Sequence, residues 1–265
     1  MSKIKNAFKN GKAFIAFLTA GDPSIEKTEE FILEMVKGGA DLIEIGIPFS
    51  DPIAEGPVIQ SANVRALNAK TTTDKVFEMI KSVRTKTDVP IVLLTYLNPV
   101  FKYGYEKFFK ICNETGIDGI IIPDMPYNEK SECADIATKN NVDIISMIAP
   151  TSDQRIKEIA SQAKGFVYVV SSMGVTGVRS EITTDLNSIL KSIKSVTSTP
   201  TAIGFGISTP EQAREMAKIA DGVIVGSAIV KIVEQYGVDC VPYVAEYVRE
   251  MKKAVSSADT IPRTK

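Results

Sequence analysis

Residues 41–57 carry the pattern in this sequence that most clearly points to chemistry. Glu44 lies near the end of the apolar run Leu42–Gly46, and two more carboxylates, Asp51 and Glu55, follow in a loop rich in proline and glycine. A carboxylate buried at the end of an apolar strand costs several kcal/mol unless it is paired or used. We therefore expect this stretch to hold the reactive groups of the protein.

The direction of Glu44 follows from the alternation of side chains along a strand. Glu44 shares one face with Leu42, whereas Ile43 and Ile45 point to the other face. If Glu44 faces an apolar interior, loss of hydration raises its pKa and suits it both to donate and to accept protons. The alternative is a structural glutamate that pairs with a lysine or a tyrosine hydroxyl of the core.

The loop carboxylates are open to more than one interpretation. Asp51, which precedes Pro52, can form a simple turn, and Glu55 can be a solvated surface acid. The sequence contains no histidine, so acid–base chemistry must rely on carboxylates, lysine, tyrosine or cysteine. Histidine is also the commonest metal ligand, and its absence argues against a metal site.

Glycine-rich segments after three apolar runs indicate a phosphate site. They are residues 171–177, residues 204–206, and the pair Gly226-Ser227, which opens a short helix. Glycine lets backbone N–H groups approach an anion closely, and a helix N-terminus favours a phosphate. The alternative is a set of tight turns that bind no ligand.

A slot for a flat apolar group is predicted beside the phosphate site. Apolar side chains near the ends of the same runs would line it, and Tyr96 and Tyr168 add hydroxyls at its rim. Each of these residues alone is typical of a core, but together with a phosphate site they describe a pocket. The predicted lining residues are Phe17, Ile59, Leu94, Ile121 and Met147.

These residues need a frame that brings the ends of many strands together. Eight short apolar runs rich in valine and isoleucine recur along the chain, as expected for parallel strands buried on both faces. An amphipathic segment at helical spacing follows each run. The predicted strands are Ala13–Leu18, Leu42–Gly46, Ile91–Thr95, Gly119–Ile122, Asp143–Met147, Phe166–Val170, Thr201–Gly204 and Val223–Val225. The predicted helices are Lys27–Lys37, Thr73–Thr85, Tyr105–Thr115, Glu129–Asn140, Ser152–Ala163, Asp185–Val196, Pro210–Ile219 and Val241–Lys253.

This alternation over about 250 residues predicts an α/β fold, a single (β/α)8 TIM barrel, with a doubly wound open sheet as the alternative. An extra N-terminal helix near Ile4–Lys9 is expected to cover the bottom of the barrel. We predict one domain over residues 1–255 and a polar, disordered tail over residues 256–265. Function in such a barrel sits at the carboxyl ends of the strands, where the carboxylates and glycine-rich turns fall.

Composition argues against several classes of partner. The net charge is −1 and no sustained basic run occurs, so neither nucleic acid nor an anionic membrane is expected as the main partner. No run of about 18 apolar residues predicts a membrane span. The amino terminus lacks the apolar region of a signal peptide and the three cysteines form no C-x-x-C pair, which favours a cytoplasmic location.

These motifs resemble those of the tryptophan synthase alpha subunit family. The resemblance rests first on the string from Leu42 to Gln60 and runs from about residue 5 to residue 253. Further motifs that carry it are residues 17–23, 96–99, 121–124, 149–151, 174–177, 204–208 and 225–230.

The resemblance implies a lyase that needs no cofactor and no metal. Its substrate would be indole-3-glycerol phosphate, cleaved in a retro-aldol reaction to indole and D-glyceraldehyde 3-phosphate. The indole would pass to a beta subunit, a pyridoxal-phosphate enzyme, in an alpha2beta2 complex that makes L-tryptophan. The resemblance implies that Glu44 moves the protons and that Tyr168 lies near it. It implies a phosphate site formed by Gly177, Phe205, Gly206, Gly226 and Ser227, and a beta-subunit contact formed by Pro48, Phe49 and Asp51.

Glu55 departs from the family pattern. The family carries aspartate in an Ala-Asp-Gly-Pro string, whereas this chain has glutamate between Ala54 and Gly56. The resemblance implies that this carboxylate accepts a hydrogen bond from the indole N–H and stabilises positive charge on the ring. A misplacement of ~1 Å at such a group can cost ~100-fold in rate, so either the loop adapts or catalysis is impaired.

Two other functions remain alternatives to the lyase. One is a different phosphate-binding barrel enzyme, such as a sugar-phosphate isomerase, which would want a histidine or lysine at the rim. The other is a catalytically weakened subunit that acts mainly as an allosteric activator of the beta subunit. The loop over residues 177–184, with Arg179 and Glu181, is long and polar enough to close over the site as a lid.

Overall fold

The computed structural model describes residues 2–171 and 185–258, so the predicted lid over residues 177–184 lies outside the described residues. Within the described part, nine parallel strands form one sheet in the order β5-β4-β3-β2-β1-β9-β8-β7-β6. The strands are β1 (Ala13–Thr19), β2 (Leu42–Gly46), β3 (Ile91–Leu94), β4 (Gly119–Ile121), β5 (Asp143–Ile144), β6 (Ser146–Ile148), β7 (Val167–Val170), β8 (Thr201–Gly204) and β9 (Gly222–Val225).

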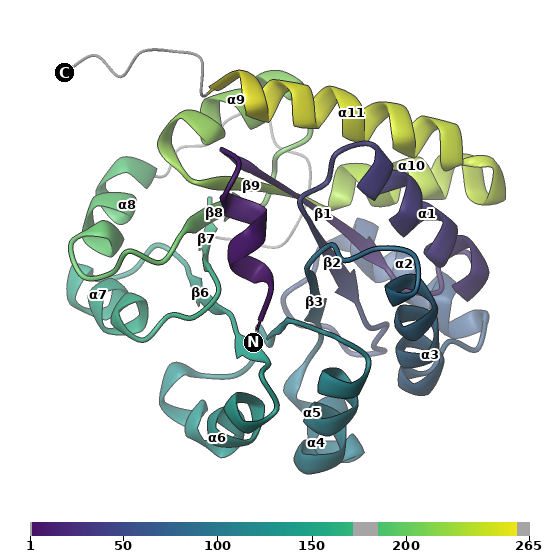
Figure 1. Ribbon diagram of the computed structural model, residues 1–265, viewed down its shortest axis with the longest axis horizontal. Coiled ribbons are helices and arrows are strands. Elements are labelled where there is room, and N and C mark those ends of the chain that lie inside the picture. The colour runs from purple at the N-terminus through teal and green to yellow at the C-terminus, as the bar shows by residue number, and fades with distance from the viewer. Residues whose placement is uncertain (1, 172–184, 259–265) are drawn as a thin grey trace.

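The sheet is the predicted TIM barrel. β5 and β6 are two parts of one predicted strand, separated by Ile145, whose N–H still bonds to the carbonyl of Ile120 at 2.9 Å. The two ends of the strand order are therefore neighbours along the chain, and the barrel closes with the helices outside it (Figure 1). The helices are α1 (Ile25–Lys37), α2 (Pro57–Asn68), α3 (Thr73–Arg84), α4 (Leu97–Tyr103), α5 (Tyr105–Glu114), α6 (Ser131–Lys139), α7 (Asp153–Ser161), α8 (Leu186–Lys194), α9 (Pro210–Ile219), α10 (Ser227–Tyr236) and α11 (Val241–Ser257).

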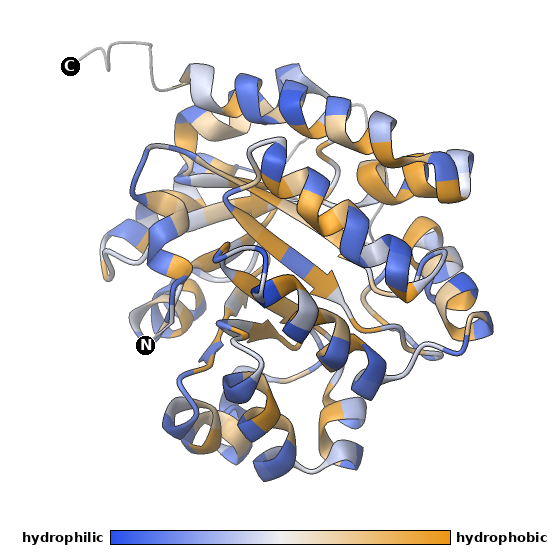
Figure 2. Cartoon of the chain, turned by 45° about the vertical axis from the view of Figure 1, so that its right-hand side comes forward, coloured by the Kyte–Doolittle hydropathy of each residue, from blue (hydrophilic) through white to orange (hydrophobic). Residues whose placement is uncertain are grey.

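Burial on both faces explains why the strands read as continuous apolar runs. Every residue of β1, β2, β7, β8 and β9 is buried. Figure 2 shows apolar strands surrounded by helices with one polar face. Leu42 belongs to the cluster inside the barrel, whereas Ile43 and Ile45 belong to the cluster between sheet and helices. The predicted inward direction of Glu44 is therefore confirmed.

A short 3-10 helix, η1 (Ile4–Phe8), closes the amino end of the barrel, as predicted (Figure 1). Ile4 is fully buried, and its side chain lies so close to Gly119 and Gly165 that a Cβ at either position would come within 3.0 Å of it. Only glycine at these two positions lets η1 sit this deeply. η1 therefore plugs one end of the barrel and leaves the other end for function.

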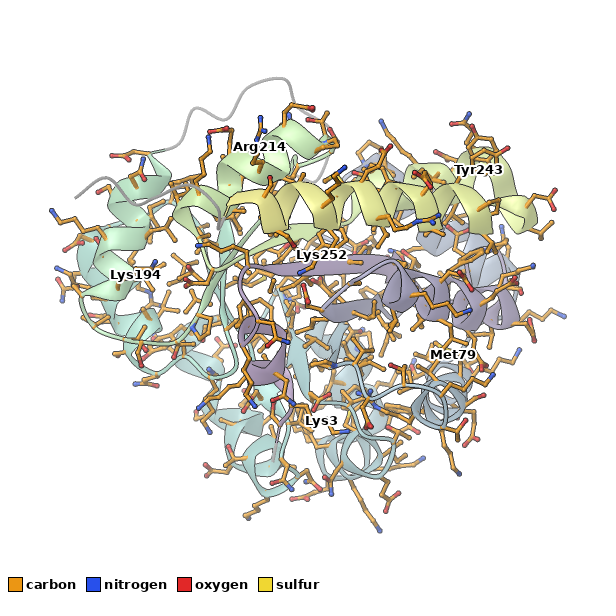
Figure 3. The ribbon with its side chains drawn as sticks, turned by 45° about the horizontal axis from the view of Figure 1, so that its top comes forward. Lys3, Met79, Lys194, Arg214, Tyr243 and Lys252 are labelled. Carbon is orange, nitrogen blue, oxygen red and sulfur yellow. The ribbon has the colours of Figure 1, made fainter. Side chains whose placement is uncertain are left out.

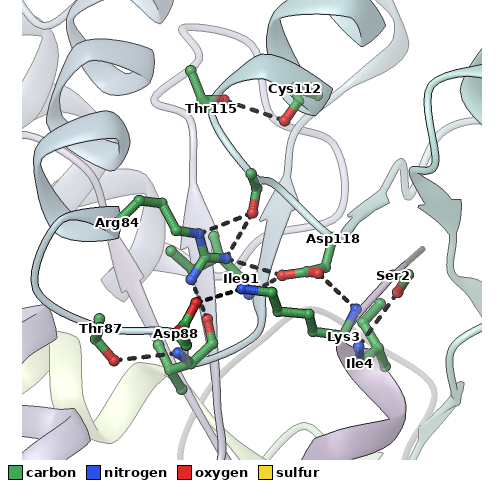
Figure 4. Close-up of polar contacts among 12 residues, drawn as sticks. Ser2, Lys3, Ile4, Arg84, Thr87, Asp88, Ile91, Cys112, Thr115 and Asp118 are labelled. Carbon is green, nitrogen blue, oxygen red and sulfur yellow. Dashed lines mark hydrogen bonds and ion pairs between the residues drawn. The ribbon is translucent and has the colours of Figure 1, made fainter.

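Asp118, at the foot of β4, ties the amino terminus to the barrel (Figure 4). Its carboxylate accepts hydrogen bonds from the backbone N–H of Lys3 at 2.7 Å, the guanidinium of Arg84 at 2.9 Å and the backbone N–H of Ile91 at 3.1 Å. A buried carboxylate with this many partners is a structural group.

The last helix, α11, packs against α1 and α9 on the outside of the barrel. Lys252 of α11 reaches inward to Asp41, just before β2, at 2.7 Å (Figure 3). The helix continues to Ser257, and Ala258 is buried, so the predicted start of a tail at residue 256 is wrong. The apolar stripe of α11 extends to Val255, which keeps this last turn docked.

Two helices were not predicted, and both follow strands that carry site residues. α2 begins at Pro57, a residue favoured at the first helical position, but its buried face consists mainly of small residues. α4 contains Pro99 near its start, which reads as a turn in the sequence. α2 carries the buried residues Ile59 and Asn63, and α4 carries the exposed Phe101.

Candidate active site

A pocket opens at the carboxyl ends of the strands, at the end of the barrel away from η1. It holds about 680 Å³ of space between atoms, part of it open to solvent. The predicted residues in its wall are Phe17, Glu44, Glu55, Ile59, Leu94, Met147, Tyr168, Phe205, Gly206, Gly226 and Ser227. Ala54, Pro123, Ile207 and Ile224 also line it and were not predicted.

Glu44 is the most deeply buried carboxylate in this wall. It lies on β2 between Phe17 of β1 and Val92 of β3, and it is 1% exposed. Among the described residues, no group hydrogen-bonds its Oε2 atom. Burial raises the pKa of Glu44 to about 8. At neutral pH this side chain is therefore a neutral acid that faces an apolar pocket and is ready to give up a proton.

Tyr168 of β7 faces the same space. Burial, followed by the negative charge of Glu44, holds the pKa of Tyr168 well above its usual range, so its hydroxyl keeps its proton. A Cβ at Gly204 of β8 would lie 2.4 Å from that hydroxyl, which is why the neighbouring strand ends in glycine. The ring meets Phe205 edge-on, with centroids 5.8 Å apart. Tyr168 thus joins the acid side of the pocket to the predicted phosphate side.

Glu55 also faces the pocket and is 7% exposed, so it is neither a simple turn residue nor a solvated surface acid. Its carboxylate accepts a hydrogen bond from Asn63 Nδ2 at 2.6 Å and another from the hydroxyl of Tyr96. Burial raises the pKa of Glu55, and the two hydrogen bonds oppose that rise. Two carboxylates therefore share one pocket, one without a partner at Oε2 and one held from two sides.

The predicted phosphate turns meet at one end of the pocket. Phe205 and Gly206 both have a φ of 76°, a conformation that a phenylalanine rarely adopts, and the hydroxyl of Ser171 donates to the Phe205 carbonyl at 2.5 Å. Gly226 precedes α10, whose first turn begins at Ser227 and, in the described part of the chain, is capped by no side chain. Gly177, the remaining predicted member of this site, lies outside the described residues.

Ile121 does not line the pocket, so that prediction is wrong. It is fully buried in the cluster that fills the barrel beneath the pocket, together with Leu42 and Val92. Pro123, two residues further on, lines the pocket instead. The side-chain direction was predicted correctly, but β4 stops at Ile121 and the pocket begins one layer higher.

The loop predicted to contact a partner is only partly exposed to solvent. Pro48 is buried, and the ring of Phe49 rests on Tyr96 with centroids 5.3 Å apart, whereas Asp51 is exposed. Two large apolar side chains are exposed after β2 and β3: Ile53, in the loop after β2, at 74% and Phe101 of α4 at 67%. They follow the neighbouring strands β2 and β3, so both lie at the pocket end of the barrel.

Two classes of feature were not found in the described part of the chain. Across residues 2–171 and 185–258, no cluster of three or more histidine, cysteine, aspartate or glutamate side chains could hold a metal ion. In the same ranges, no helix combines the length and apolar character needed to cross a membrane.

Comparison with known proteins gives concordant matches. A family model described as "Tryptophan synthase alpha chain" matches residues 3–256. The "Tryptophan synthase alpha chain" of Lacticaseibacillus casei is 50% identical over 261 residues, 98% of each chain. The crystal structure of the alpha chain from Legionella pneumophila has a TM-score of 0.87 and 34% identity and covers all of both chains. A chain from the tryptophan synthase a2b2 complex of Pyrococcus furiosus has a TM-score of 0.84 and 37% identity, over 91% of this chain and 98% of that one.

Proposed function

The chain belongs to the tryptophan synthase alpha chain family, and we propose from this membership and from the pocket a role for each of its site residues. Its reaction is the cleavage of indole-3-glycerol phosphate to indole and D-glyceraldehyde 3-phosphate. Its partner is a beta chain, with which it forms an alpha2beta2 complex and to which the indole passes for L-tryptophan synthesis. We further infer a cytoplasmic location.

Glu44 is the proton shuttle of this reaction. Because it is neutral at the start, it can deliver its proton to ring carbon 3 of the indole, and positive charge then spreads to the ring nitrogen. The resulting carboxylate takes the proton from the side-chain hydroxyl next to the ring. The carbon–carbon bond breaks, its electron pair returns to the ring, and the hydroxyl carbon becomes the aldehyde. Glu44 ends as the neutral acid with which it began, so no histidine is needed.

Glu55 and Tyr168 assist Glu44 in this reaction. The Glu55 carboxylate accepts a hydrogen bond from the indole N–H and offsets the positive charge that develops on the ring nitrogen. Tyr168 keeps its proton and lies beside Glu44, so it can donate a hydrogen bond to Glu44 once that group has ionised. The buried, hydrogen-bonded position of Glu55 does not favour the alternative of a weakened subunit that only activates its partner.

The substrate lies across the pocket with its phosphate at the glycine-rich end. The backbone N–H groups of Phe205, Gly206 and Gly226 and the hydroxyl of Ser227 bind the phosphate, helped by the N-terminus of α10. The indole lies among the apolar wall residues, which exclude water from the reacting carbon. These wall residues are Phe17, Ile59, Leu94, Met147, Pro123, Ile207 and Ile224. Gly177 keeps its proposed role in phosphate binding.

The beta chain binds at the same end of the barrel. The proposed contact comprises Pro48, Phe49 and Asp51, extended by the exposed Ile53 and Phe101. Isolated side chains of this size and exposure are common, but these two both lie at the end of the barrel where the pocket opens and from which indole must leave. Catalysis and partner contact therefore share the loop after β2.

The observation that carries this proposal is the position of Glu44, which is buried in the wall of the apolar pocket and whose Oε2 has no hydrogen-bond partner among the described residues. The test is indole release from indole-3-glycerol phosphate by the purified chain, alone and with a beta chain. A Glu44→Gln variant is expected to lose about 1,000-fold in kcat and to keep its substrate affinity. Retention of turnover by this variant would remove Glu44 from the mechanism. No indole release by the unmodified chain in either condition would overturn the function itself.

A further inference from the structure

The Glu55 carboxylate is fixed from two directions by side chains that are themselves buried. Asn63, on α2, is 3% exposed and donates its amide N–H to Glu55 Oε2 at 2.6 Å. Tyr96, at the end of β3, is 2% exposed and donates its hydroxyl to the same carboxylate. The two donors come from different elements, so their spacing is set by the barrel and not by the loop that carries Glu55.

Asn63 lies on the buried face of α2, where a polar side chain is unexpected. Its neighbours on that face are Ile59, Ala62 and Ala66. An amide buried among apolar groups costs free energy unless it is hydrogen-bonded, so the bond to Glu55 explains its presence there. The same bond explains how a flexible glutamate can be held in one orientation.

The helix that carries Asn63 is itself clamped. Arg65 forms two hydrogen bonds to the carboxylate of Asp22, after β1, both at 2.8 Å, and a third to Glu234 of α10 at 2.9 Å. Ile59 and Ala62 pack with Phe17 and Val230 in one cluster between α2, β1 and α10. Asn63 therefore donates from a fixed position.

Tyr96 fixes the loop backbone as well as the carboxylate. Its hydroxyl accepts a hydrogen bond from the backbone N–H of Ala54, the residue before Glu55, at 3.2 Å. Its ring is packed against Phe49, and the N–H of Leu97 donates to Asp124 at 2.9 Å, which anchors the turn that follows. One hydroxyl thus holds both the loop and the acid at its end.

We propose that Asn63 and Tyr96 are positioning residues that aim the Glu55 carboxylate at the indole nitrogen and so let glutamate serve where the family has aspartate. This inference rests on the proposed function, because it takes Glu55 as the carboxylate that faces the ring nitrogen. Neither residue is part of the pocket wall. Their effect on the reaction passes through Glu55.

The charged and titratable groups around Glu55 predict a change in pH profile. Glu44 shares its pocket from β2, Tyr96 faces it from β3, and Asp124, after β4, acts on Tyr96. Activity needs Glu55 ionised, so the acid limb of kcat against pH reports its pKa. Removal of either donor takes away one of the two effects that oppose burial, which raises that pKa and moves the acid limb to higher pH.

The experiment compares Asn63→Ala and Tyr96→Phe with the unmodified chain, each in complex with the beta chain and each checked for folding by thermal unfolding. We expect kcat for indole release to fall about tenfold or more in each variant, with KM nearly unchanged. The acid limb should move to higher pH in both. Asn68→Ala, an exposed asparagine at the end of the same helix, is the matched control and should change neither kcat nor the limb.

A double-mutant cycle separates this inference from the proposed function. If Asn63 acts through Glu55, Asn63→Ala should have almost no further effect on kcat in a Glu55→Gln background. A full additional loss in that background, or an acid limb that stays in place, would overturn the positioning role. An unimpaired Glu55→Gln single variant would instead overturn the proposed role of Glu55. Tyr96→Phe keeps the ring packing, so it tests the positioning role even if Asn63→Ala unfolds.

Discussion

Asp118 and Glu44 are both buried carboxylates on neighbouring parts of one barrel, yet they lie at opposite ends of it. Asp118, before β4, is 5% exposed and accepts hydrogen bonds from a guanidinium and two backbone N–H groups (Figure 4). Glu44, near the end of β2, is 1% exposed, and among the described residues its Oε2 has no partner. The carboxylate at the amino end has several hydrogen-bond partners, whereas the carboxyl group at the other end has, among the described residues, none at its Oε2 atom.

The difference shows how this fold separates stability from chemistry. Each buried polar group at the foot of the barrel helps to hold η1 and the strands together. At the opposite end, two features cost free energy: Glu44, whose Oε2 has no partner among the described residues, and Phe205 with its positive φ. Glu44 supplies a proton, and Phe205 shapes a phosphate-binding turn. The two unfavourable features therefore lie where the reaction uses them.

The largest effect expected from this comparison is on the free energy of unfolding. We expect the contribution of Glu44 to that free energy to depend on pH. Its pKa is about 8 in the folded chain and near 4.5 when exposed, so between these values the folded state binds more protons than the unfolded state. Stability from this group is complete at low pH and is lost as pH rises towards 8. At about 1.4 kcal/mol per pKa unit, the loss reaches about 5 kcal/mol.

A Glu44→Gln variant isolates this contribution because glutamine does not titrate. We expect the variant to become progressively more stable than the unmodified chain between pH 5 and pH 9, as measured by urea unfolding. All other titrating groups are common to both chains and cancel in the difference. A difference that stays constant with pH would show that Glu44 is not held neutral in the folded chain.

At the other end of the barrel, Asp118→Ala should destabilise the fold by about 3 kcal/mol. The substitution leaves the Arg84 guanidinium, whose side chain is 13% exposed, without its carboxylate, and frees the N–H of Ile91. Unfolding by urea measures the loss, and kcat per folded molecule should stay unchanged. Asp88→Ala is the control, because Asp88 pairs with Lys3 in the same region but its side chain is 90% exposed. Equal losses in the two variants would show that burial at this end carries no special stability.

The barrel itself could be predicted because strands buried on both faces leave a strong pattern. Strand alternation correctly placed Glu44 on the same face as Leu42, and the extra helix η1 was predicted at the amino end. α2 was missed because its buried face, with Ala62, Asn63 and Ala66, lacks the large apolar residues that mark an amphipathic helix. That miss concealed Asn63, the partner of Glu55.

The limits of the site prediction have a similar cause. The direction of Ile121 was correct, but its height along the barrel depends on where β4 ends, and sequence patterns place strand ends poorly. Pro123, two residues beyond the end of β4, was missed for the same reason, whereas Ile224 lies in β9, whose end at Val225 was predicted correctly. Ile53 and Phe101 could have been suspected, because each is a large apolar residue next to a proline-rich turn, but exposure is visible only in the fold.

The smallest effect concerns the other carboxylate of the pocket. The sequence left open whether glutamate at position 55 impairs the enzyme, in which case Glu55→Asp would raise activity. Asn63 and Tyr96 now favour the opposite outcome, because both donors reach the carboxylate at the length of a glutamate. An aspartate would be one methylene short of them, so we expect kcat for indole release to fall about tenfold, or about 1.4 kcal/mol.

The measurement is kcat for Glu55→Asp in the isolated chain and in complex with the beta chain. Glu114→Asp, the same chemical change at an exposed helix end, is the control and should leave kcat unchanged. A rise in kcat for Glu55→Asp would mean that the hydrogen bonds from Asn63 and Tyr96 restrain a misplaced acid. A fall in kcat for Glu55→Asp that no substitution at position 63 or 96 restores is a further outcome. That result would show that the loop backbone, through Ala54, is what adapts the site to a glutamate. The expected fall, with the acid limb displaced as in Asn63→Ala, would show that the two carboxylates differ because of their surroundings: one left without a partner to move protons, the other held still to meet a charge.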